Sequence, residues 1–397
     1  MKKIELLAPA GRIENLKIAL LYGADAVYFG GRNYSLRANA KNLGIDEIKE
    51  ACDYAHKYSK KVYVTVNIVF HNEDVDGLVE YLRELEKCGV DAIIVSDPLV
   101  INIVHKNMIN IPIHISTQYS TVNYETVKFF KNLGVERVVL GRESSRDEIK
   151  EIIDKTGVEV ETFVHGAMCA SYSGRCVLSN YFTNRDANRG GCSQICRWNF
   201  DLCVDGEKID TDTKFTMCSK DLCMLEYLKE MIDIGISSLK VEGRMRSIYY
   251  VATVINTYRR AIDDYYNDNL NKEKMEYYLK VLGRVANRDS CPQFFNRFPD
   301  MNEQYFLGRE EISNQDYLGI VNSYDGEYVT LTQKNYFKPG DEVEFISPDK
   351  EIITYVIPDI YDMDGNKLDC ARHPEQIIKF KIDKELSEYD MMRIKIK

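Results

Sequence analysis

The sequence predicts an α/β fold, a (β/α)8 TIM-like barrel with a Cys-rich insertion between strands 7 and 8, plus a small C-terminal β domain. The first observation is a recurring phrase in which a helix ends at a glycine turn and a short apolar strand follows. It begins at Leu21, Lys87, Asn132 and Asp233. Glycine adopts the left-handed conformation at a helix end without strain, and strands apolar on both faces are typical of buried parallel sheets.

The second observation is that four more apolar segments alternate with these phrases. They lie at residues 4–9, 60–70, 111–118 and 158–166. The resulting eight strands and their helices span about 245 residues, which is the size of a closed barrel. An open doubly wound sheet is the alternative, but no glycine-rich dinucleotide-binding fingerprint follows the first strand.

The domain boundaries follow from changes in this pattern. We assign residues 1–283 to the barrel, with the insertion at about 166–236, because a helical pattern continues to Leu282. Residues 284–312 contain two prolines and several polar residues, which is typical of a linker. Residues 313–397 contain short strands, two of them joined by an Asp325-Gly326 turn, and predict a small β-barrel or sandwich.

Composition narrows the class of protein. The 397 residues are 45% hydrophobic and carry a formal net charge of −10, so no overall positive field attracts nucleic acid or an anionic membrane. No apolar segment is long enough for a membrane span, and the start MKKIELLAPAG lacks the apolar run of a secretory signal. We therefore expect a cytoplasmic protein without a membrane partner, in which clustered cysteines are ligands rather than disulfides.

Four of the eleven cysteines lie within 28 residues of the insertion: Cys169, Cys176, Cys192 and Cys196. Two zinc knuckles are excluded, because their paired cysteines are separated by only about two to four residues. An iron-sulfur cluster tolerates irregular spacing, since its own sulfides fix its geometry. From the spacing alone, an iron-sulfur cluster, a zinc ion and unrelated thiols all remain open.

The cysteine segment is also the basic segment of the chain. It contains Arg175, Arg185, Arg189 and Arg197. Only one acid, Asp186, lies between the first and last of these arginines. Guanidinium groups bind phosphates and carboxylates in bidentate geometry, so these arginines are candidate contacts to RNA or to a small acid. The alternative is that they are solvated surface side chains.

Polar residues end most of the predicted strands, where the active sites of such barrels lie. Arg142, His165, Glu242 and Arg244 are among them, and we count Arg142 and Arg244 among the candidate substrate-binding arginines. We select His165 and Glu242 as candidate catalytic residues, since His165 lies four residues before Cys169 and Glu242 belongs to the alternating charged run KVEGRMR. Strand ends are also polar simply because they meet solvent. A cysteine peptidase pairing Cys169 with His165 is compatible with the sequence.

Several segments together resemble one known family. ETFVHGAMCASYSGRCVLSNY, from Glu161, is similar to the signature of the U32 peptidases, which are called collagenase-like proteases. LLAPAG, GADAVYFGG, SLRANAKN, STQYS, RDANRGGCSQICRW, SKDLCMLEYL and LKVEGRMRS resemble other segments of this family, in the same order. The form of the cysteine segment and the C-terminal β module resemble the branch that hydroxylates transfer RNA.

The resemblance implies a function, a cofactor and partners. The implied function is formation of 5-hydroxyuridine at the tRNA wobble position, with prephenate or a similar small carboxylate as the candidate oxygen donor and a paralogous U32 subunit as a partner in some bacteria. The cofactor is a 4Fe-4S cluster on Cys169, Cys176, Cys192 and Cys196, with Cys223 as a reserve for the fourth position. Arg37 matches a family arginine and is a further candidate for the carboxylates. The alternatives are a U32-type peptidase and a non-catalytic partner subunit.

Overall fold

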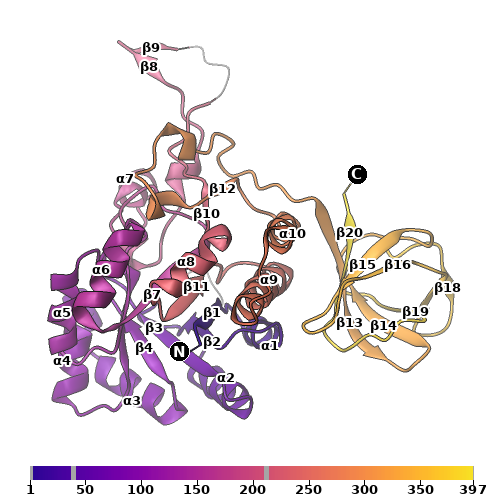
Figure 1. Cartoon of the computed structure of the whole chain (residues 1–397), viewed down its shortest axis with the longest axis horizontal. Helices are drawn as coiled ribbons and strands as arrows, with labels where there is room; N and C mark the ends of the chain where they lie inside the picture. The colour runs from indigo at the N-terminus through magenta and orange to yellow at the C-terminus, as the bar shows by residue number, and fades with distance from the viewer. Residues whose placement is uncertain (1–2, 37–41, 210–213, 397) are drawn as a thin grey trace.

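The computed structural model describes residues 3–36, 42–209 and 214–396. Eight parallel strands form a closed barrel, because β11 pairs with both β7 and β1 (Figure 1). The barrel strands are β1 (Glu5–Pro9), β2 (Ala26–Gly30), β3 (Lys61–Val66), β4 (Ala92–Val95), β5 (Ile113–Ile115), β6 (Arg137–Val139), β7 (Glu159–Gly166) and β11 (Ser238–Val241). The predicted (β/α)8 barrel is confirmed, and every predicted strand is present.

Helices surround the barrel and alternate with its strands (Figure 1). They are α1 (Ile13–Leu21), α2 (Ile45–Lys57), α3 (Leu78–Cys88), α4 (Pro98–Lys106), α5 (Tyr124–Asn132), α6 (Arg146–Thr156), α8 (Leu228–Asp233), α9 (Ile248–Tyr266) and α10 (Lys272–Leu282). Local signals explain their ends. Ser145 and Glu148 form a capping box at the start of α6, and Gly157 ends this helix at a φ of 61°.

The insertion between β7 and β11 contains little regular structure. Its elements are α7 (Leu178–Thr183), β8 (Cys203–Val204), β9 (Glu207–Lys208) and β10 (Asp221–Cys223). The β8–β9 hairpin projects from the molecule, whereas β10 pairs antiparallel with β7 (Figure 1). The insertion is therefore anchored on the strand that precedes the cysteines.

Residues 284–312, predicted as a linker, form part of this anchored layer. Strand β12 (Ser290–Cys291) pairs with β10, and Ser219 forms a bridge with Gln304. A buried ion pair between Arg288 and Asp221 explains the association, because each charge would be costly to bury alone. The composition of this segment, from which a linker was predicted, did not reveal this long-range partner.

The C-terminal domain is an eight-stranded antiparallel sheet with its own apolar core. Its strands are β13 (Gln315–Tyr324), β14 (Tyr328–Gln333), β15 (Glu342–Ile346), β16 (Ile353–Val356), β17 (Ile360–Asp362), β18 (Lys367–Leu368), β19 (Ile377–Lys381) and β20 (Met391–Lys395). The rings of Tyr249 and Tyr317 stack 5.1 Å apart between α9 and β13. The domain therefore packs against the barrel helices that follow β11.

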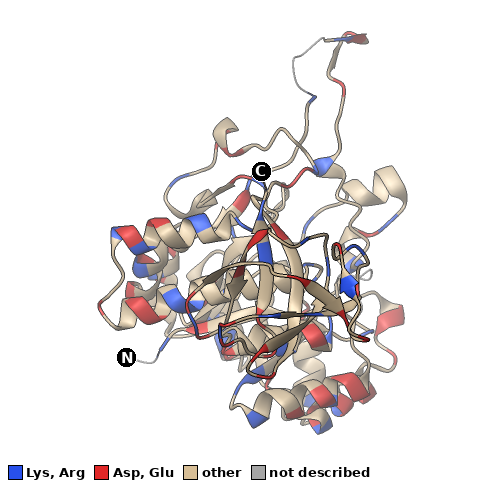
Figure 2. Ribbon diagram, turned by 90° about the vertical axis from the view of Figure 1, so that its right-hand side faces the viewer, with Lys and Arg blue, Asp and Glu red and all other residues tan. Residues whose placement is uncertain are grey.

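Acidic and basic residues are interspersed along the helices and the C-terminal domain (Figure 2). In the part of the chain that the structure describes, no helix is long and apolar enough to cross a membrane. The net charge of −10 directs attention to a local site for any contact with nucleic acid.

Candidate active site

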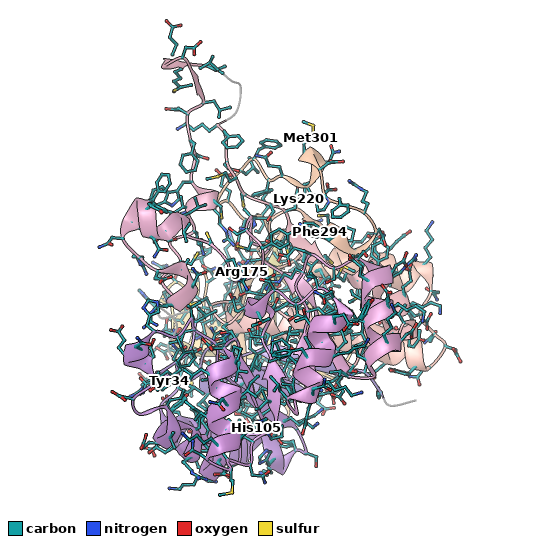
Figure 3. The ribbon with its side chains drawn as sticks, turned by 90° about the vertical axis from the view of Figure 1, so that its left-hand side faces the viewer. Tyr34, His105, Arg175, Lys220, Phe294 and Met301 are labelled. Carbon is teal, nitrogen blue, oxygen red and sulfur yellow. The ribbon has the colours of Figure 1, made fainter. Side chains whose placement is uncertain are left out.

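A cavity of about 190 Å³ opens at the carboxyl ends of the barrel strands, beneath the insertion. Strand ends contribute Thr65, Asn67, Phe163 and Lys240 to its lining, and the insertion contributes all four clustered cysteines. Arg175 lies on the insertion side of the barrel, whereas His105, near the end of α4, lies at the opposite side (Figure 3). The cavity is therefore at the face where barrels of this type hold their active sites.

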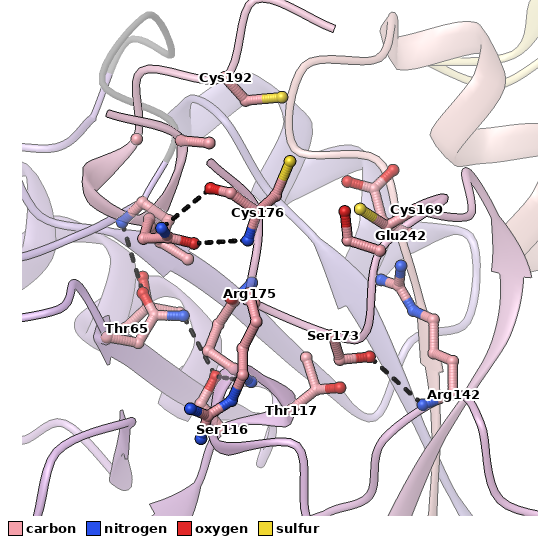
Figure 4. Close-up of a pocket in the computed structure, with 18 of the residues that line it drawn as sticks. Thr65, Ser116, Thr117, Arg142, Cys169, Ser173, Arg175, Cys176, Cys192 and Glu242 are labelled. Atoms are coloured by element: carbon pink, nitrogen blue, oxygen red, sulfur yellow. Dashed lines mark hydrogen bonds between the residues drawn. The ribbon is translucent and has the colours of Figure 1, made fainter. Parts of the chain in front are cut away.

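The four clustered cysteines all line this one cavity. Cys169 and Cys192 are exposed, whereas Cys176 and Cys196 are half-buried. The sulfur atoms of Cys169, Cys176 and Cys192 point toward a common space (Figure 4). Burial, followed by the nearby Cys169, raises the pKa of Cys196 to about 11. Four cysteines around one cavity are the type of donor that an iron-sulfur cluster uses.

Cys223, the reserve ligand, lies outside this group. It belongs to β10, and its Sγ lies 3.9 Å from the hydroxyl of Tyr258 on α9. It is absent from the cavity lining that the structure describes. Among the described residues, no group of three or more His, Cys, Asp or Glu side chains is placed to hold a single metal ion.

Asn188 fixes the backbone at Cys176. The Asn188 side chain accepts a hydrogen bond from the Cys176 backbone nitrogen at 3.2 Å and donates one to the Cys176 carbonyl at 3.0 Å. The next residue, Arg189, forms an ion pair with Asp74 and donates to the Val69 carbonyl at 2.8 Å. The hydrogen bond from Arg189 lowers the pKa of Asp74 to about 2. The loop after β3 and the cysteine segment are thus tied together.

A second tie holds the cysteine segment at Ser173. The backbone nitrogen of Ser173 donates to the Glu143 carboxylate at 2.9 Å, and its hydroxyl donates to the same group at 3.1 Å. The following residue, Gly174, has a φ of +80°, and a Cβ there would lie 2.0 Å from Oε1 of Gln118. Glycine permits this close approach of the insertion to the segment after β5.

The inner wall of the barrel below the cavity contains a buried ion-pair network. Lys240 Nζ lies 2.9 Å from Glu161, and Arg137 Nη1 lies 3.1 Å from the same carboxylate. Burial alone would raise the pKa of Glu161, but Lys240 and then Arg137 hold it below its usual value. Lys240 also lies 4.2 Å from the ring centroid of Tyr28. This network gives the cavity a charged but internally paired floor.

Three of the predicted substrate-binding arginines line the cavity: Arg142, Arg175 and Arg244. The Arg142 guanidinium stacks 3.9 Å from the Phe163 ring centroid, and its buried Nε has no hydrogen-bond partner among the described residues. Arg244 is buried and donates to the hydroxyls of Ser35 at 3.0 Å and Thr65 at 3.2 Å. The Nε of Arg142 is therefore an unused hydrogen-bond donor, whereas Arg244 holds two hydroxyl side chains of the cavity wall in place.

The other four candidate arginines are placed differently. Arg185, Arg189 and Arg197 are absent from the described lining of the cavity. Arg185 is exposed, and Arg197 Nη1 donates to Gln194 at 3.3 Å. Arg37 lies outside the described residues.

The structure places the two candidate catalytic residues, Glu242 and His165, in different surroundings. Glu242 lines the cavity, and Figure 4 shows it beside Cys169. His165 is 4% exposed and packs against the rings of Tyr250 and Tyr258, at 6.1 and 5.7 Å between centroids. The pairing of β7 with β11 shifts register next to His165, which departs from the regular alternation that would turn this side chain inward. Burial lowers its pKa to about 3, which keeps the imidazole neutral.

Sequence reasoning did not select Asn188, Glu161 or Lys240 as site residues. Asn188 belongs to a loop, where no periodic pattern marks its hydrogen bonds to Cys176. The charges of Glu161 and Lys240 in otherwise apolar buried strands were a usable signal, because a buried charge requires a partner.

Comparisons with known proteins indicate the same family along nearly the whole chain. A family model described as "Peptidase family U32" matches residues 11–305, and one described as "Peptidase family U32 C-terminal domain" matches residues 313–393. The tRNA hydroxylation protein P1 of Bacillus subtilis is 50% identical over 400 residues, which cover 99% of this chain and 95% of that protein.

Two further relatives are more distant. The tRNA hydroxylation protein P of Escherichia coli is 34% identical over 402 residues, covering 89% of this chain and 88% of that protein. A collagenase of Porphyromonas gingivalis is 33% identical over 298 residues, covering 72% of this chain and 71% of that protein.

Proposed function

The chain belongs to peptidase family U32, and from this premise we propose that it is an RNA-modifying hydroxylase that forms 5-hydroxyuridine at the wobble position of tRNA. The observation that carries the proposal is the 50% identity, over nearly the whole chain, to a protein named for tRNA hydroxylation. The cavity supports the proposal, because cysteine thiols, which are ligands of redox-active clusters, and arginine side chains line the same space. A protease would not need four thiols around one cavity.

The proposed cofactor is a 4Fe-4S cluster held by Cys169, Cys176, Cys192 and Cys196. Support comes from the position of all four thiols around one cavity. When bound, such a cluster supplies electron transfer and a Lewis-acidic iron. The protein's own contribution is to hold the thiols, and the two hydrogen bonds between the Asn188 side chain and the Cys176 backbone orient that backbone.

Hydroxylation replaces a C–H bond at C5 of the pyrimidine by a C–OH bond, so a donor must deliver oxygen and accept two electrons. We propose prephenate, a small dicarboxylate, in this role. Arg142 is a cation on the cavity wall that suits these carboxylates. The buried, unpartnered Nε of Arg142 supports this assignment, because such a donor is costly to leave unsatisfied.

The peptidase alternative rests on the family name and on the collagenase relative. A cysteine peptidase requires a thiol within hydrogen-bond reach of a general base. The pair compatible with the sequence is Cys169 with His165, but His165 packs against the ring of Tyr258 on α9 and does not line the described cavity. The geometry therefore favours hydroxylation over this mechanism.

The proposal is tested by purifying the full chain without oxygen. We expect a brown protein with broad visible absorption and about four iron atoms per chain, both lost in Cys176→Ala. Incubation of the loaded protein with undermodified tRNA and prephenate should yield hydroxyuridine. A colourless, iron-free preparation that cleaves protein substrates would contradict the proposal and establish the peptidase alternative.

A further inference from the structure

A second cavity, of about 460 Å³, adjoins the first at the cysteine segment. The two cavities share one wall, formed by Gln118, Gly174, Arg175, Cys176 and Asn188. The rest of its lining comes from the segments after β4 and β5, including Asp97, Pro98 and Tyr119, together with Val69 and Val177. Its volume lies within the range of about 300–1,000 Å³ typical of small-molecule sites.

Polar groups in this second cavity are left without partners. Among the described residues, the Arg175 guanidinium forms no ion pair, and the Gln118 side-chain amide forms no hydrogen bond. Asp97 accepts from the Leu99 backbone nitrogen with Oδ1, and its Oδ2 receives no hydrogen bond from the described part of the chain. One cation, one amide and one carboxylate oxygen are thus available beside the half-buried Tyr119.

We propose that the second cavity binds the nucleotide next to the target in the RNA loop, while the target base enters the cavity beside the cysteines. This inference rests on the proposed function and adds a site that reads sequence context. Arg175 lines both cavities and would hold the phosphate that joins the two nucleotides. Figure 4 shows its side chain directed away from the three labelled thiols.

The chemistry of the wall matches a nucleobase better than a second small acid. Tyr119 offers an aromatic surface for stacking, and the Gln118 amide offers both a donor and an acceptor to a base edge. Asp97 would repel an anion but accepts a hydrogen bond from an amino or imino group. Enzymes that act on an extruded base contact the flanking nucleotides in this way.

The test is a double-mutant cycle on binding affinity, measured between an anticodon stem-loop RNA and the full chain purified without oxygen. Its four arms combine wild-type protein or Gln118→Ala with RNA that is intact or abasic at the flanking position. Loss of one stacked and hydrogen-bonded base should weaken binding about tenfold. If the proposal is correct, Gln118→Ala and the abasic change should each weaken binding, and together they should weaken it no more than the larger single effect.

Tyr119→Leu provides a second variant that keeps an apolar contact with Phe130, whose ring lies 4.7 Å away. Tyr58→Leu is the matched control, because Tyr58 is 52% exposed at the end of α2, outside both cavities. Additive effects of protein and RNA changes would overturn the second site while leaving hydroxylation intact. Failure of the wild-type protein to bind the RNA at all would instead contradict the proposed function.

Discussion

Replacing His165 by Phe tests whether this histidine is a packed structural group or a proton carrier. Its imidazole is 4% exposed between Tyr250 and Tyr258, and its Nδ1 has no partner among the described residues. Burial lowers its pKa from 6.5 to about 3. Below about pH 6.5 the unfolded chain therefore binds a proton that the folded protein does not bind until about pH 3, so stability falls as the pH falls through this window.

The size of the effect follows from this shift. Between these limits one such histidine contributes a slope of about 1.4 kcal/mol per pH unit to the free energy of unfolding, and about 5 kcal/mol in total. His114, whose pKa burial also lowers to about 3, remains in the variant. The dependence of stability on pH should therefore become shallower by about 1.4 kcal/mol per pH unit without disappearing.

The assay is urea unfolding at several pH values between about 4.5 and 7, with both proteins prepared identically. Phe has a similar shape and needs no hydrogen bond, so stability at neutral pH should change by no more than about 1.5 kcal/mol. If the variant and the wild type show the same slope of unfolding free energy against pH, His165 is not a buried neutral imidazole in the folded protein. Loss of hydroxylation with stability intact would restore His165 as a catalytic residue.

Three further changes probe the cavity. Asn188→Ala removes both hydrogen bonds to the Cys176 backbone and should lower retained iron per chain, at a cost of about 1–3 kcal/mol in stability measured by unfolding. Lys240→Met leaves the Glu161 charge without its nearest partner and should destabilise the fold by about 3–5 kcal/mol, and adding Glu161→Gln should recover part of this loss in thermal melts. Cys223→Ala should keep full iron content in elemental analysis, since Cys223 does not line the described cavity; loss of iron would instead make Cys223 a ligand.

The sequence allowed the barrel to be predicted in full, because parallel strands buried on both faces leave a local apolar pattern. Leu6, Leu7 and Ala8 of β1, for example, are completely buried. The same reasoning placed the cysteines at the carboxyl ends of the strands. Short strands β16, β17 and β18 carried no such pattern, and their pairing depends on partners far along the chain.

The site was predictable only in part. Alternation along KVEGRMR correctly pointed to one inward face, because Lys240, Glu242 and Arg244 all line the cavity. The selection of His165, as a strand-end residue close in sequence to Cys169, did not foresee the register shift between β7 and β11 next to this residue. Arg189 looked like a phosphate contact, but its partner is Asp74, which no local pattern connects to it.

The hydroxylation of tRNA is tested most directly on tRNA from cells. The gene is deleted, then restored as the wild type, as Cys176→Ala or as the Tyr58→Leu control, and tRNA nucleosides are quantified by mass spectrometry. We expect 5-hydroxyuridine to disappear on deletion, to return with the wild type and the control, and to stay absent with Cys176→Ala. Unchanged 5-hydroxyuridine after deletion, or full restoration by Cys176→Ala, would contradict this expectation.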